Sequence, residues 1–184
     1  WKDVGTLESL WDANMDMLSP GSGLNLLDRR WPIYSRTPSC PPAYVGVKAD
    51  IGNSVVAKGC EVLGEVKNSV LSYNTQVGEG AVVSYSVLMP GAVVESGAVV
   101  QYAIVGESCR IGRDAQVGAP PETAQDPDDW GVAVLGPGTV IATTGWWTLC
   151  SPAWSTPGST MWASSCTASA RVCWIIWATA AAGI

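Results

Sequence analysis

Histidine is absent from this 184-residue sequence, as is phenylalanine, and charged residues make up only 14% of it. Without histidine the chain lacks the side chain that most often serves as a general base or a metal ligand near neutral pH. Lysine and arginine number 10 against 16 acidic residues, which gives a net charge of −6. Proteins that bind nucleic acid carry clustered basic residues, so this balance argues against that function.

Several familiar motifs are also missing. None of the six cysteines forms a C-x-x-C pair, and no G-x-x-x-x-G-K-[ST] phosphate loop is present. No signal peptide is expected, because no early apolar stretch follows a charged leader. The longest apolar run, 172–184, has 13 residues, whereas a membrane helix needs about 20. Because the sequence begins with Trp1 and not Met, we expect a fragment of a longer protein.

What the sequence does contain is a period close to six residues between Leu71 and Gly118. Steps of six, six and five reach nine aliphatic residues: Leu71, Val77, Val83, Leu88, Val94, Val100, Val105, Ile111 and Val117. Two positions before each stands a small residue: Ser69, Thr75, Ala81, Ser86, Ala92, Ala98, Ala103, Cys109 and Ala115. This period fits neither a helix nor an ordinary strand. It predicts a β-helix of hexapeptide repeats, with the aliphatic residue inward and the small residue at the adjoining corner.

A longer repeat overlies the hexads. The four-residue segments 53–56 (NSVV), 68–71 (NSVL), 85–88 (YSVL) and 102–105 (YAIV) recur at steps of 15, 17 and 17. Three hexads make 18 residues, so we expect triangular coils of three strands with residues lost at one corner. The hexads begin at Val45 and Ile51, and Gly64 and Val66 close a shortened coil. Each coil buries its aliphatic residues by stacking on its neighbours.

The segments outside the repeat have different compositions. Thr6 is expected to cap a helix that begins at Leu7, with Leu7, Leu10, Trp11, Met15 and Leu18 on one face. Residues 21–44 are rich in proline and read as a linker. The linker carries Arg29, Arg30 and Arg36, which are either solvated charges or contacts for a phosphate-bearing effector.

The C-terminal part departs from the repeat twice. Residues 119–133 contain adjacent prolines and four acidic residues and are expected to form an exposed loop, after which Leu135 and Ile141 resume the hexads. From about Thr143 to Ile184 six tryptophans accompany a single charge, Arg171. This abrupt change is typical of a coding region read in a shifted frame, and the alternative is a genuine apolar tail that packs on a partner.

The absence of histidine bears directly on the predicted β-helix. Acyltransferases of this architecture use a histidine base, and carbonic anhydrases of this architecture hold zinc with three histidines, so neither activity is expected. The segments WKDVGT (1–6), LESLWDANMDML (7–18) and NLLDRRWPIYSR (25–36), followed by hexads, closely resemble bacterial glucose-1-phosphate adenylyltransferase. The resemblance runs from Trp1 to about Ile141.

The resemblance implies an α/β nucleotidyltransferase domain followed by a left-handed parallel β-helix. Residues 1–20 would then end the first domain, 21–44 would be the linker, 45–142 the β-helix and 143–184 the tail. The family joins ATP and glucose 1-phosphate into ADP-glucose and pyrophosphate for glycogen synthesis in the cytoplasm. In its W-[KR]-D-V-G-T motif the aspartate, here Asp3, ligates Mg²⁺, and the tryptophan, here Trp1, lies by the sugar phosphate.

The family's glycine-rich nucleotide loop and second metal aspartate precede this motif, so we expect the chain alone to be inactive. The resemblance also implies that the β-helix serves oligomerisation and allosteric control. In this sequence the tail replaces the end of the β-helix that contributes to both.

 Two alternatives stay open. One is a stand-alone hexapeptide scaffold that binds a partner or a small ligand without catalysis. The other is a related enzyme that transfers a different nucleotide, such as a thymidylyl- or guanylyltransferase, although the D-R-R-W-P-I-Y linker disfavours it through the same resemblance.

Overall fold

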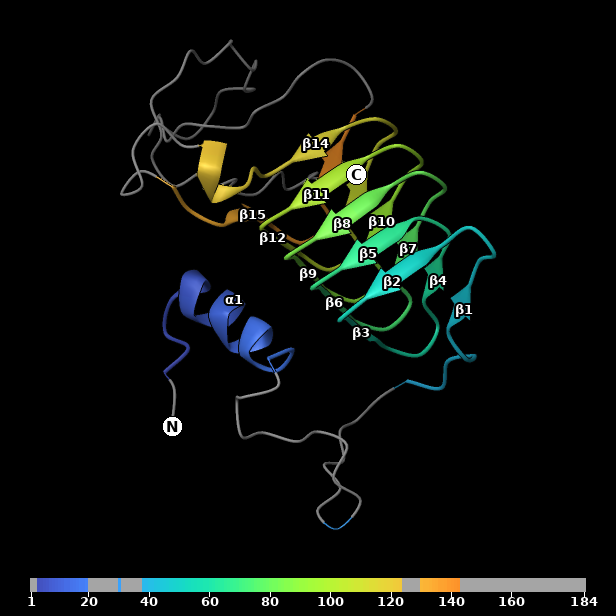
Figure 1. The fold of residues 1–184 in the computed structure, drawn as a ribbon, viewed down its shortest axis with the longest axis horizontal. Coiled ribbons are helices and arrows are strands. Elements are labelled where there is room, and N and C mark those ends of the chain that lie inside the picture. Colours follow the sequence, from blue (N-terminus) through green and yellow to red (C-terminus); the bar gives the residue numbers. More distant parts are fainter. Residues whose placement is uncertain (1–2, 20–29, 31–37, 124–129, 143–184) are drawn as a thin grey trace, which may run out of the picture.

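The computed structural model describes residues 3–19, 30, 38–123 and 130–142, and its main body is a β-helix built from three parallel sheets (Figure 1). The first sheet has six strands: β1 (Tyr44–Val45), β4 (Glu61–Val62), β7 (Gln76–Val77), β10 (Val93–Val94), β13 (Arg110–Ile111) and β16 (Val140–Ile141). The second has five: β2 (Asp50–Gly52), β5 (Glu65–Lys67), β8 (Val82–Ser84), β11 (Val99–Gln101) and β14 (Gln116–Val117). The third also has five: β3 (Val55–Val56), β6 (Val70–Leu71), β9 (Val87–Leu88), β12 (Ala103–Val105) and β15 (Ala133–Leu135). Each coil contributes one strand to each sheet, which confirms the prediction of three-stranded coils.

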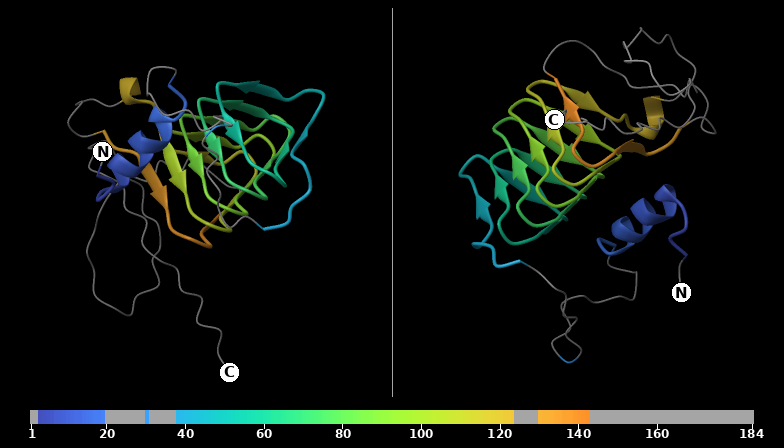
Figure 2. Two further views of the ribbon diagram at one scale, coloured as in Figure 1. Left: turned by 90° about the horizontal axis from the view of Figure 1, so that it is seen from below. Right: turned by 180° about the vertical axis from the view of Figure 1, so that it is seen from behind.

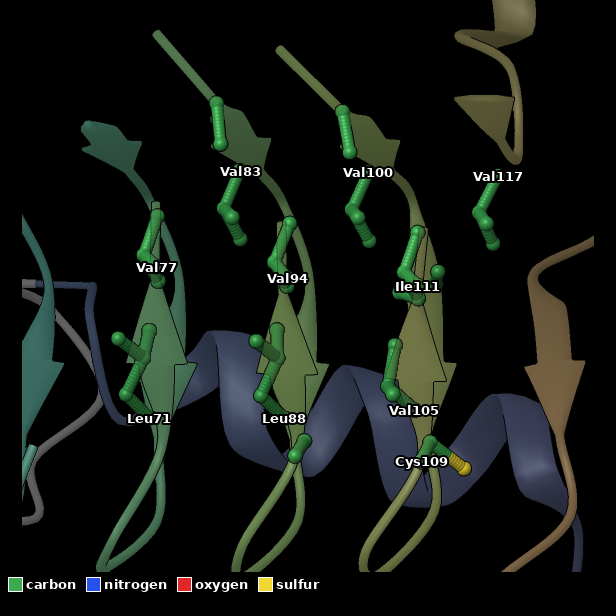
Figure 3. Packing of buried hydrophobic residues seen from close by; sticks show 14 of the residues in the cluster. Leu71, Val77, Val83, Leu88, Val94, Val100, Val105, Cys109, Ile111 and Val117 are labelled. Atoms are coloured by element: carbon green, nitrogen blue, oxygen red, sulfur yellow. The ribbon is translucent and has the colours of Figure 1, made fainter. Parts of the chain in front are cut away.

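The core consists of the aliphatic residues that the six-residue period selected. All nine of them between Leu71 and Val117 are at most 4% exposed, and the nine small residues that precede them are at most 6% exposed. Equivalent residues of successive coils stack in columns, for example Leu71 on Leu88 and Val83 on Val100 (Figure 3). The predicted inward register is therefore confirmed over this stretch.

The first coil differs from this pattern. Val45 is 49% exposed, although its place in the hexad predicts a buried side chain. The physical reason is that β1 is an end strand of its sheet and pairs only with β4, so within the described residues no coil covers its other side. Burial in a β-helix requires a neighbour on each side, and a hexad alone does not supply it.

The shortened coil has a specific cause at its corner. The register from β4 to β7 pairs Glu61 with Gln76, a step of 15 residues, whereas β7 to β10 pairs Gln76 with Val93, a step of 17. A Cβ added at Gly64 would stand 2.6 Å from the carbonyl oxygen of Gly78 and closer still to that of Ala81. Only glycine therefore fits this tight corner, which confirms the predicted shortening at Gly64.

A ladder of serines joins the second and third sheets. The hydroxyl of Ser54 accepts a hydrogen bond from the backbone N–H of Ser69 at 3.2 Å, and Ser69 accepts one from Ser86 at 3.1 Å. Ser86 in turn accepts from the N–H of Ala103 at 3.2 Å. Because these amides are turned toward the core, the hydroxyls supply partners that water cannot provide.

Helix α1 (Leu7–Asp16) lies along the outer face of the third sheet (Figure 2). Its N-cap is Thr6, whose hydroxyl accepts a hydrogen bond from the N–H of Ser9 at 3.1 Å, as the sequence predicted. Four side chains of the predicted apolar face, those of Leu7, Leu10, Trp11 and Met15, pack against a buried cluster formed by Val87, Ile104 and Val132. The helix thus docks on the β-helix.

The prediction of an exposed loop over residues 119–133, between β14 and β15, is wrong in part. The loop is exposed at its short 3-10 helix, η1 (Pro121–Thr123), whereas Ala119 and Pro120 before it are half-buried. The end of the loop is not exposed, because Val132 is 4% exposed and Trp130 is half-buried against the same cluster that receives α1. Leu135 and Ile141 are buried, which confirms the return of the hexads. The expectation for residues 143–184 lies outside the described residues.

Candidate functional site

Asp3 is the predicted metal ligand, and it lies exposed three residues before the N-cap of α1. A Cβ added at Gly5 would meet the Oδ2 atom of Asp3 at 3.4 Å, so the carboxylate folds back beside this glycine. Thr6 and the first turn of α1 hold the end of the motif, because the N–H of Leu10 donates to the carbonyl oxygen of Thr6 at 3.0 Å. The position of Asp3 is thereby tied to a helix that is itself docked.

Of the other predicted site residues, only Arg30 lies in the part of the chain that the structure describes. Trp1, Arg29 and Arg36 lie outside the described residues. Arg30 is exposed in a turn. Only Arg30 of the three arginines lies among the described residues, so the effector contact stays a prediction.

The described residues offer Mg²⁺ the right type of ligand, an oxygen of a carboxylate, but no group of several such ligands. Mg²⁺ prefers oxygen ligands, and protein sites usually offer it one or two carboxylates. Asp3 is a carboxylate of that kind, yet no group of three or more His, Cys, Asp or Glu side chains suited to a metal occurs in the described ranges. Asp3 is therefore the one predicted metal ligand among the described residues.

A shallow groove of about 350 Å³ lies on the outer face of the first sheet. Its lining includes Glu61, Gln76, Glu95, Arg110 and Arg113. One Nη atom of Arg110 donates to Glu95 at 2.6 Å, and the charges of the two glutamates balance those of the two arginines. The groove is on a different face from α1 and Asp3. Its lining has no net excess of positive or negative charge that would favour a ligand of the opposite charge.

Two thiols occupy small inward positions of the coils. Cys60 and Cys109 are free and at most 1% exposed. Their Sγ atoms donate to backbone carbonyl oxygens of Ser72 and Gly136, each at 3.0 Å. Burial raises the pKa of both thiols, because the interior disfavours the charged thiolate. These cysteines are core residues and not nucleophiles.

The most elaborate side-chain arrangement is an aromatic cluster that the sequence did not reveal. The indole N–H of Trp11 donates to the backbone carbonyl of Tyr85 at 2.7 Å. The ring of Tyr102 lies between those of Tyr85, Trp11 and Trp130, with centroid distances of 4.8, 6.0 and 5.4 Å. The tyrosines stood out in the sequence only as members of the longer repeat, and the period of 17 was the one signal that they shared a corner.

No helix in the described part of the chain is long and apolar enough to cross a membrane. Histidine, the side chain that most often serves as a general base, is missing from the whole sequence. The geometry therefore offers a stacked scaffold, a docked helix and, at the predicted metal position, the exposed carboxylate of Asp3.

Comparison with known proteins identifies the scaffold. Residues 43–136, about half of the chain, match the family model described as GlmU-like, C-terminal hexapeptide. A glucose-1-phosphate adenylyltransferase of Clostridioides difficile (strain 630) is 50% identical over 93 residues, which cover 50% of this chain and 24% of that protein. The protein of the same name from Bacillus mycoides (strain KBAB4) is 51% identical over 94 residues, which cover 51% and 25%. The matched part thus spans about a quarter of the length of these curated relatives.

Proposed function

The chain belongs to the family of GlmU-like, C-terminal hexapeptide domains, and on this premise we propose that it is the β-helix part of a glucose-1-phosphate adenylyltransferase. The observation that carries the proposal is the identity of about 50% with relatives of that name over some 93 residues. The segment WKDVGT supports it independently, because this motif precedes a β-helix in the adenylyltransferases that the chain resembles. The complete enzyme would transfer the adenylyl group of ATP to glucose 1-phosphate.

Within that enzyme the residues singled out in the sequence would have different roles. Asp3 would supply one carboxylate ligand of Mg²⁺, a metal that neutralises phosphate charge when it is bound. Trp1 would lie by the sugar phosphate, and Arg29, Arg30 and Arg36 would be contacts for a phosphate-bearing effector. The β-helix would serve oligomerisation and allosteric control, because a stack of coils presents long rigid faces.

The chain by itself is proposed to be inactive. The carboxylate of Asp3 alone cannot hold Mg²⁺ together with two anionic substrates, and the described ranges contain no group of three or more side chains suited to a metal. Incubation of the purified chain with ATP, glucose 1-phosphate and Mg²⁺ should release no pyrophosphate above the protein-free control. Formation of ADP-glucose by the chain alone would contradict this part of the proposal.

The main proposal is tested by the DNA on either side of the coding region. A nucleotidyltransferase domain in frame before Trp1 is expected, with a glycine-rich nucleotide loop and a second acidic residue. A shifted frame after Thr143 is expected to restore aliphatic residues at six-residue spacing. A start codon directly before Trp1 would overturn the proposal and favour a non-catalytic hexapeptide scaffold.

The scaffold alternative has one observation in its favour, namely that the described residues contain no group of three or more side chains suited to hold a metal. The alternative of an enzyme that transfers another nucleotide is tested by the nucleotide preference of the complete enzyme. With glucose 1-phosphate, that enzyme should use ATP in preference to dTTP or GTP. Preference for dTTP would assign the chain to a thymidylyltransferase.

A further inference from the structure

One corner of the β-helix carries a row of residues in the left-handed backbone region. The row comprises Asn53, Asn68, Tyr85 and Tyr102, with φ between 40° and 47°. Asparagine tolerates this conformation, and the side chain of Asn53 donates to that of Asn68 at 2.9 Å. A bulky tyrosine does not tolerate it well, so two tyrosines here are outliers that call for an explanation.

The change from asparagine to tyrosine coincides with the position of α1. The helix packs on Val87 and Ile104, which belong to the same two coils as Tyr85 and Tyr102. Val55, in the coil of Asn53, is 39% exposed. Tyrosine thus replaces asparagine where the helix lies against the sheet, which links the strained residues to the docked helix.

The contacts explain what the tyrosines provide there. The two tyrosine rings stack at 4.8 Å with an interplanar angle of 8°. Trp11 packs on Tyr102 and Trp130, and its indole N–H is bonded to the carbonyl of Tyr85. Trp130 is anchored in turn, because its own indole N–H donates to Ala119 at 2.9 Å. Tyr85, Tyr102 and Trp130 therefore form one rigid docking site for a single side chain of the helix.

Helix α1 depends on such a site. It has only 10 residues, and none of its side chains is fully buried. An isolated helix of fewer than about 12 residues is marginal in water. Its stability must then come from its contacts on the third sheet, and Trp11 contributes a hydrogen bond and two ring contacts to them.

We propose that Trp11 is a positioning residue, held by Tyr85, Tyr102 and Trp130 so that the β-helix fixes α1 and with it the Asp3–Thr6 segment. The part that concerns Asp3 rests on the proposed function, whereas the docking of the helix does not. Tyr85 and Tyr102 are accordingly docking residues, which occupy a strained corner because their rings receive Trp11.

The experiment is hydrogen–deuterium exchange on the 184-residue chain, followed by mass spectrometry of peptides that cover residues 3–16. The decisive variant is Tyr102→Asn, which installs the residue type that the same corner carries in the first coils. The coils should melt at an unchanged or higher temperature, because asparagine relieves the left-handed strain. Exchange in residues 7–16 should become faster by about tenfold, since an aromatic contact and the burial that it provides are lost.

Two further variants separate docking from general stability. Tyr102→Phe keeps the ring and should retain the slow exchange of the helix. Trp11→Leu leaves every coil residue intact, so it reports on the docking site even if Tyr102→Asn fails to fold, and it should also release the helix. Exchange of residues 7–16 that is unchanged in both Tyr102→Asn and Trp11→Leu would overturn the proposal, as would a loss of coil stability in Trp11→Leu equal to that of the helix.

The readout needs no catalytic activity. If the flanking DNA rejects an adenylyltransferase while the exchange results hold, the proposed function fails and the docking of α1 stands. If the DNA supports the enzyme and the exchange is unchanged, the positioning role fails and the proposed function stands.

Discussion

Replacement of Val100 by aspartate tests the inward register of the core most directly. Val100 is 0% exposed and lies in register between Val83 and Val117 of the neighbouring coils. Loss of a buried valine costs roughly 1.5–3 kcal/mol, and an unpaired polar group in its place adds about 1–3 kcal/mol even when it is uncharged. Because small domains are stable by only about 5–15 kcal/mol, Val100→Asp should remove much or all of the folding free energy.

The matched control is the adjacent residue. Val99 faces outward on the same strand and is half-buried, so Val99→Asp should cost only about 1 kcal/mol, the range of strand preferences on a sheet surface. Both variants are compared by urea unfolding followed by circular dichroism. Equal losses in the two variants, or a melting temperature of Val100→Asp that matches the unaltered chain, would refute the inward assignment.

The dependence on pH gives a second check on Val100→Asp. Burial disfavours the charged form of the introduced carboxyl and raises its pKa in the folded state. Below about pH 4, the ordinary pKa of aspartate, both states hold the proton and the destabilisation is smallest. As pH rises above that value the unfolded state releases the proton and the folded state resists, so the destabilisation should grow. A loss of stability that is independent of pH would show that the carboxyl reaches water.

Three other substitutions or treatments follow from the same coils. Gly64→Ala should destabilise the chain by about 1–3 kcal/mol or more, because the added Cβ would collide with backbone carbonyls. The control Gly52→Ala should be nearly neutral in thermal melts, because its Cβ would meet only the Cγ atom of a lysine, at 3.6 Å. Ser86→Ala should cost about 1–3 kcal/mol in urea unfolding by leaving a buried N–H without its partner, and an unchanged midpoint would contradict the serine ladder. Iodoacetamide near neutral pH should modify half-buried Cys40 well before buried Cys60. Burial raises the pKa of the Cys60 thiol in the folded state. Its contribution to the free energy of unfolding should therefore be fully present below the ordinary thiol pKa of about 8.5 and should fall as pH rises above that value.

The candidate site could be predicted only in part from the sequence. Asp3 was identified through a sequence resemblance, and the structure adds that it is exposed and directly precedes a docked helix. The docking site could not be predicted, because Trp11 and Tyr85 are 74 residues apart and no local pattern pairs them. The left-handed backbone at Tyr85 and Tyr102 likewise appears only once the coils are stacked.

The sequence by itself determined the three-stranded coil, the buried columns and the shortened corner. Each of these is marked by residues within a single turn of the β-helix, although the neighbouring coils complete the burial: an aliphatic residue every five or six positions, a small residue two before it, and Gly64 where the chain must turn tightly. Tertiary structure alone decided that Val45 is exposed, that Val132 is buried and that α1 packs on the third sheet. Those outcomes depend on which surfaces meet across long stretches of chain, because burial is a property of both partners and a local pattern describes only one.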